Sequence, residues 1–146
     1  MLNTKKRPLI VWILVFSSVL ISLSCNESDQ EDIPYVYVNF TINPQSIEYG
    51  DLDIPGNYAY VTGGYRGIII YHRTQNDFYA YERACTFDPL ESDARVEVGE
   101  ENTLISCPSC GSRYLMLDGS PFDGPAIRSL RQYKTHYDGF NLTVTN

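Results

Sequence analysis

The sequence predicts an all-β domain built from short strands, and three observations carry this prediction. Twelve tyrosines, together with frequent valine and isoleucine, favour strands over helices. Short apolar runs recur at spacings of roughly 8–12 residues and are separated by Gly, Pro, Asn and Asp turn signals. No stretch keeps a 3.6-residue apolar period for three turns. A sandwich or a stack of small antiparallel sheets is therefore expected.

The expected strands follow one another along the chain. Residues 35–43 alternate strictly, with Val36, Val38, Phe40 and Ile42 on one face, which is the period of a half-buried strand. Tight turns are predicted at Asp118-Gly119 and, between the last two segments, at Asp138-Gly139. The remaining expected segments are 58–62, 67–72, 78–83, 95–98, 103–106, 113–117, 126–134 and 140–145.

Residues 1–24 have the pattern of an export signal. Lys5, Lys6 and Arg7 precede an apolar stretch over 9–23, which is shorter than the roughly 20 residues of a membrane-spanning helix. The stretch ends at Ser24-Cys25 and resembles a bacterial lipobox, so we expect lipid on Cys25 to anchor the protein to a membrane. The alternatives are an uncleaved anchor helix and a plain secretory signal.

This interpretation divides the chain into a lipoprotein signal peptide (1–24), an acidic tether (25–34) and a β domain (35–146). The expected location is the cell envelope, at the outer membrane, on its periplasmic face or at the cell surface. The signal lacks a twin-arginine pair, which indicates the general secretory path. The envelope is oxidising, so the remaining cysteines can pair there.

The charge of the mature chain excludes two classes of partner. After removal of the three basic residues in the signal, eight basic residues face 18 acidic ones, a net charge of −10. Such a surface repels nucleic acid and anionic headgroups. We therefore expect no nucleic-acid partner and no contact with the membrane beyond the lipid.

Three cysteines are the candidate chemical site. Cys85 follows an expected strand, and Cys107 and Cys110 form a C-x-x-C 22 positions later. A C-x-x-C brings two sulfurs close enough to hold one ion or to form a disulfide. No histidine lies near these cysteines in the sequence to serve as the base of a cysteine nucleophile.

The cysteine segments resemble the Rieske iron–sulfur domain, which has C-x-H in one loop and C-P-x-H-G-S-x-F in the other. The resemblance covers about residues 58–146 and rests on Cys85, the segment 107–114 (CPSCGSRY), the turn 118–121 (DGSP) and the segment 124–133 (GPAIRSLRQY). The segment 37–42 (YVNFTI) also resembles the start of small Bacteroidetes lipoproteins. The Rieske resemblance implies three stacked antiparallel sheets, two loops meeting at one tip, a [2Fe–2S] cluster and electron transfer.

The ligand set departs from the family pattern. A Rieske centre takes two cysteines on one iron and two histidines on the other. Cys85 and Cys107 match the cysteines, whereas Phe87 and Cys110 stand at the histidine positions. Other donors considered are His72, His136 and Asp88, each read as an ordinary strand-end, surface or turn residue. Three interpretations stay open: a disulfide between Cys85 and one of the pair, an altered cluster site and a zinc site.

The expected function is therefore a cluster-free binding or structural lipoprotein of the cell envelope, without enzymatic activity and with an unknown protein partner. The alternative is an electron-transfer protein that binds [2Fe–2S] through Cys85, Cys107, Cys110 and an unidentified fourth ligand. A thiol–disulfide module that uses the C-x-x-C is a third hypothesis. No helix start follows Cys110 to lower a thiol pKa, which ranks that hypothesis last.

Overall fold

The computed structural model describes residues 32–146, and these form antiparallel β-sheets with one short 3-10 turn, η3 (Ile47–Tyr49). The predicted signal peptide, Cys25 and most of the tether lie outside the described residues. Across residues 32–146, no helix is long and apolar enough to cross a membrane. The all-β prediction is confirmed.

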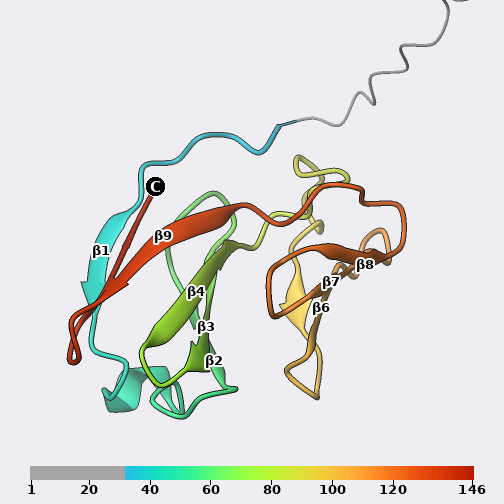
Figure 1. The fold of residues 1–146 in the computed structure, drawn as a ribbon. Helices are drawn as coiled ribbons and strands as arrows, with labels where there is room; N and C mark the ends of the chain where they lie inside the picture. The colour runs from blue at the N-terminus through green and yellow to red at the C-terminus, as the bar shows by residue number, and fades with distance from the viewer. Residues whose placement is uncertain (1–31) are drawn as a thin grey trace, which may run out of the picture.

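The strands form two sheets (Figure 1). The larger sheet has the order β1-β10-β9-β4-β3-β2, and the smaller has the order β5-β6-β7-β8. The strands of the larger sheet are β1 (Asn39–Ile42), β2 (Tyr58–Val61), β3 (Ile68–Thr74), β4 (Asp77–Glu82), β9 (Gln132–Tyr137) and β10 (Leu142–Thr145). Those of the smaller sheet are β5 (Glu97–Val98), β6 (Leu104–Ser106), β7 (Arg113–Leu115) and β8 (Pro121–Asp123).

The larger sheet is covered on both faces, because successive side chains of its inner strands enter two different cores. On β3, Ile68 and Ile70 pack with β1 and β10 residues, whereas Ile69 points to the other face. There Ile69 and Tyr81 pack against the smaller sheet, which contributes Ile105 and other buried residues. The continuous apolar run that marks β3 in the sequence therefore fits a strand buried on both faces.

The third sheet implied by the family resemblance is merged into the larger one through β9. Gln132 and Tyr133 pair with β4, whereas residues 134–137 pair with β10. Strand bounds also differ from expectation. β1 starts only at Asn39, β9 starts at Gln132 rather than near 126, and β8 was not predicted.

The described chain begins beside the first cysteine loop. Asp32 forms an ion pair with Arg128 at 2.8 Å, and Arg128 also donates to the carbonyl of Thr86, next to Cys85. The Arg131 guanidinium donates to the carbonyls of the two residues that follow Asp32. From there the chain crosses to β1, at the far side of the domain (Figure 1).

Candidate thiol site at the loop tip

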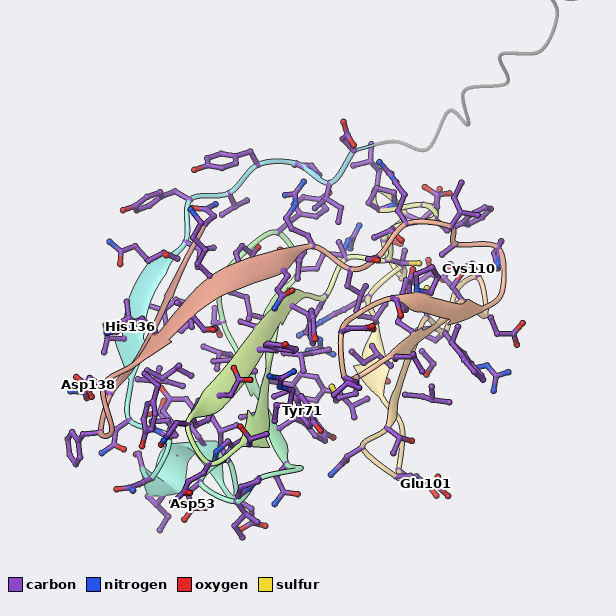
Figure 2. All side chains as sticks on the ribbon, in the orientation of Figure 1. Asp53, Tyr71, Glu101, Cys110, His136 and Asp138 are labelled. Atoms are coloured by element: carbon purple, nitrogen blue, oxygen red, sulfur yellow. The ribbon has the colours of Figure 1, made fainter. Side chains whose placement is uncertain are left out.

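The three described cysteines converge, as the two-loop prediction requires. Cys85 lies three residues after the end of β4, and Cys107 and Cys110 lie in the turn between β6 and β7. Their sulfur atoms all lie within 4.8 Å of one another, and those of Cys85 and Cys110 are 3.5 Å apart. Cys85 and Cys107 are buried, whereas Cys110, which is labelled in Figure 2, is partly exposed.

The buried carboxylate of Glu82 places the start of the first loop. It accepts from the backbone N–H of Ala84, the residue before Cys85, at 3.2 Å. It also accepts from the N–H groups of Tyr65 and Arg66 at 2.7 and 2.8 Å. A buried charge is tolerated only when hydrogen bonds replace its lost hydration, and here backbone donors supply them.

Arg66 holds the rest of the first loop. Its guanidinium donates to three backbone carbonyls, those of Pro89, Leu90 and Ser92, at 2.9–3.1 Å. The guanidinium of an arginine carries five donors on three nitrogens in a fixed planar fork, so it can bond several separated carbonyls at once. The loop after Cys85 is therefore tied to the turn between β2 and β3.

The second loop is closed by its own backbone and covered by the Gly-Pro-Ala segment. Cys107 donates its N–H to the Ser112 carbonyl at 2.8 Å, and Gly111 donates to the Cys107 carbonyl at 2.9 Å. At Gly124, with φ +92, an added Cβ would lie 2.6 Å from the Cα of Ser112. Glycine at position 124 is thus required by the close approach of the two segments.

Hydroxyl groups contact two of the three sulfurs. Tyr114 Oη lies 3.3 Å from Cys85 Sγ, and it also accepts from the N–H of Thr86. Ser112 Oγ lies 3.1 Å from Cys110 Sγ and accepts from the N–H of Ala126, which leaves its proton free for the sulfur. The sequence analysis assigned no role to these hydroxyls, although both residues lie within the 107–114 segment that resembles the Rieske domain.

The surroundings separate the pKa values of the cysteines. Burial raises the pKa of Cys107 to about 12. Partial burial also opposes ionisation of Cys110, but hydrogen bonds from Ser112 outweigh it and lower the pKa of that thiol. Burial, followed by the contact with Cys85, raises the pKa of Tyr114, so its hydroxyl stays protonated.

The other donors considered from the sequence lie elsewhere. His136 is on β9, across the molecule from Cys110 (Figure 2). The ring of His72 stacks on Phe78 in the core, and its Nδ1 lies 2.9 Å from the carbonyl of Leu52. Among residues 32–146, the three cysteines form a metal-ligand group that neither histidine nor Asp88 joins.

The three cysteines are free thiols in the structure. The predicted pairing of Cys85 with Cys107 or Cys110 stays a prediction. The spacing of 3.5 Å between Cys85 Sγ and Cys110 Sγ places one of the two expected pairs close together.

No family model matches the sequence, and no curated protein matches it. Solved structures do match. The ferredoxin of carbazole 1,9a-dioxygenase from Nocardioides aromaticivorans IC177 is 20% identical, with 75% of this chain and 95% of that chain covered at a TM-score of 0.47. A chain from the carbazole-bound oxygenase and ferredoxin complex of carbazole 1,9a-dioxygenase is 13% identical, with 74% and 28% covered at a TM-score of 0.51.

The likeness to the second of these chains is one of fold. Together with the two sheets and the paired loops, it places this chain in the Rieske-like fold class that the sequence predicts. The tip of this fold holds three cysteines able to bind a metal.

Proposed function

We propose that this protein is a lipid-anchored envelope protein that uses a Rieske-like domain without a [2Fe–2S] cluster. In this proposal it is a binding or structural protein rather than an enzyme. The observation that carries the proposal is the donor set at the tip, which consists of three sulfurs and no imidazole.

A [2Fe–2S] cluster does not fit this donor set. The cluster spreads four protein ligands over two irons. Here the three sulfurs surround one point, and Phe87, at the position of the first histidine, has no atom that can bind a metal. Cys110 replaces the second histidine. The iron that two histidines would hold therefore has at most one protein ligand here.

The predicted export route supports the same conclusion. A signal of the general secretory type threads the chain through the membrane unfolded, whereas a cluster built in the cytosol travels inside a folded domain. A chain exported in this way reaches the envelope without a cluster. The three thiols then meet only when the domain folds outside the cytosol.

The cluster is tested by purifying the full chain from membranes without air. We expect neither iron nor inorganic sulfide in stoichiometric amounts, and no visible absorption from sulfur-to-iron bands. The matched variant is Phe87→His, Cys110→His, which places a histidine at each of the two positions where the Rieske pattern has one. It should take up a cluster when incubated without air with Fe³⁺ and sulfide, and the wild type should not. Stoichiometric iron and sulfide in the wild type would favour the electron-transfer alternative.

The anchor is tested separately by feeding cells a labelled fatty acid. Label should appear on the wild-type protein and be lost in Cys25→Ser. Cys110→Ser, which removes a thiol from the domain but leaves the signal intact, is the control and should be labelled like the wild type. Equal labelling of all three proteins would end the lipoprotein interpretation.

A further inference from the structure

We propose that Cys85, Cys107 and Cys110 form a mononuclear site for one thiophilic d¹⁰ cation, Zn²⁺ or Cu⁺. This inference rests on the proposed function, because a [2Fe–2S] cluster would use the same cysteines. It extends that function by naming the class of ligand that the domain binds.

The sulfur positions fit a single ion. Zinc–sulfur bonds are about 2.3 Å long, so three sulfurs around one ion lie about 3.8 Å apart in a tetrahedral site and about 4.0 Å apart in a planar one. The observed separations include 3.5 Å between Cys85 and Cys110 and do not exceed 4.8 Å. Movements of a few tenths of an ångström at each sulfur therefore bring all three within bonding distance of one ion.

Both loops hold these positions through contacts that do not involve the sulfurs. Glu82 accepts a hydrogen bond from the N–H of Ala84, the residue before Cys85. Both the N–H and the carbonyl of Cys107 form backbone hydrogen bonds. Gly124 packs against the backbone of the second loop. A site placed in advance loses little conformational freedom when it binds an ion.

A disulfide explains only part of this arrangement. Bonding any two of the three cysteines leaves the third as a thiol, and nothing in a disulfide requires that thiol to lie within 4.8 Å of both partners. One ion uses all three sulfurs. Thiolates are soft ligands that select Cu⁺ and Zn²⁺ over the hard cations Mg²⁺ and Ca²⁺.

The hydroxyl beside Cys110 suits the negative charge that such a site would carry. Three thiolates exceed the charge of either cation by one or two units. Ser112 accepts from the N–H of Ala126, so its proton is free for Cys110 Sγ and that hydrogen bond can spread part of the excess. The hydroxyl of Tyr114, 3.3 Å from Cys85 Sγ, donates instead to Thr86 Oγ1, because the Thr86 hydroxyl itself donates to the carbonyl of Arg128. On binding, three S–H bonds are replaced by three metal–sulfur bonds, and three protons are released to solvent.

The partly exposed side of the site, at Cys110, leaves room for a fourth ligand from solvent. Zn²⁺ would bind a water there and become four-coordinate, whereas Cu⁺ would stay three-coordinate with the three sulfurs alone. The two ions therefore predict different coordination at the same three cysteines.

The test uses the full chain, extracted from membranes with detergent under anaerobic conditions and without chelator. Elemental analysis should find close to one equivalent of zinc or copper per chain. After removal of the metal, Zn²⁺ and Cu⁺ are titrated back separately. Co²⁺ serves as the spectroscopic probe of a four-coordinate site, and X-ray absorption should count three sulfur neighbours around either ion.

The variants separate ligands from fold. Cys110→Ser, at the least buried of the three cysteines, should weaken binding by more than about 100-fold, beyond the 10–100-fold that follows loss of a group hydrogen-bonded to a ligand. Ser112→Ala should fall within that 10–100-fold range. Ser109→Ala, in the same turn and exposed, is the matched control and should bind like the wild type. Circular dichroism of each variant reports whether the sheets persist.

Three results would overturn the inference. A protein with three free thiols that takes up neither cation would refute it, and so would a protein isolated with two cysteines joined in a disulfide. Both results leave the cluster-free function standing. Iron and sulfide in equal amounts would instead refute the proposed function itself.

Discussion

Glu82 offers the sharpest test of how the fold positions the first cysteine loop. Its side chain is fully buried and accepts four hydrogen bonds, from three backbone N–H groups and from the hydroxyl of Tyr133 at 2.7 Å. These donors belong to the turn after β2, to the residue before Cys85 and to β9. Replacing Glu82 by leucine keeps an apolar stem of similar size and removes every acceptor.

The cost follows from the donors left without a partner. A buried donor without an acceptor costs about 1–3 kcal/mol. The N–H of Ala84 and the hydroxyl of Tyr133 are buried and should each cost about 2 kcal/mol. The N–H groups of Tyr65 and Arg66 are part-buried, can recover water and should add little. We therefore expect Glu82→Leu to lower the free energy of unfolding by about 4–5 kcal/mol, a large share of the 5–15 kcal/mol typical of a domain.

Glu82→Gln should cost less, about 2 kcal/mol, because the amide oxygen still accepts from two N–H groups while the amide NH₂ turns toward the other donors. Glu97→Gln is the matched control. Its carboxylate is 64% exposed and lies 4.0 Å from Arg83, so its loss should cost less than about 1 kcal/mol. Urea unfolding followed by circular dichroism measures all three, since the single tryptophan, Trp12, lies in the predicted signal. A Glu82→Leu cost below that of Glu97→Gln would refute the reasoning.

Two further perturbations address the loops. Gly124→Ala should lower the free energy of unfolding by more than about 2 kcal/mol, because the added methyl group meets the backbone of Ser112. Gly139→Ala is the control: its surroundings are open, so it should cost only the roughly 1–2 kcal/mol of a left-handed backbone. Equal losses in urea unfolding would contradict this. Arg66→Lys should raise amide hydrogen exchange at Cys85 and Ala94, whose N–H groups are hydrogen-bonded within this loop, because one ammonium cannot replace the three-way contact. Arg113→Lys, at an exposed ion pair, should leave exchange at both amides unchanged. Unchanged exchange in Arg66→Lys would show that the loop is held by other contacts.

Local pattern was enough to predict most of the strands. The alternation in 35–43 and the run Ile68-Ile69-Ile70 report which faces are buried, and burial is what a period-2 or continuous apolar pattern records. β8 was missed because Pro121 and Gly124 are turn residues, and its pairing with β7 depends on a neighbour rather than on its own sequence. The strand prediction is wrong over residues 126–131 for a related reason, because these residues cross from the smaller sheet to the larger one.

The site shows the same division between local and long-range information. That Cys85 would meet Cys107 and Cys110 was predictable from the motif spacing of the family it resembles. The contact of Tyr114 with Cys85 joins residues 29 positions apart and depends on how closely two loops approach. Neither composition nor periodicity contains that distance.

The ion pair between Asp32 and Arg128 has a consequence for orientation at the membrane. Arg128 links Asp32 to the loop of Cys85, because it pairs with Asp32 and also donates to the carbonyl of Thr86. If lipid is attached at Cys25, as proposed, seven residue steps separate it from Asp32, and a fully extended chain covers at most about 25 Å over that length. The thiol tip would then stay within a short reach of the headgroups, so an ion or protein that binds the tip would meet it close to the membrane surface.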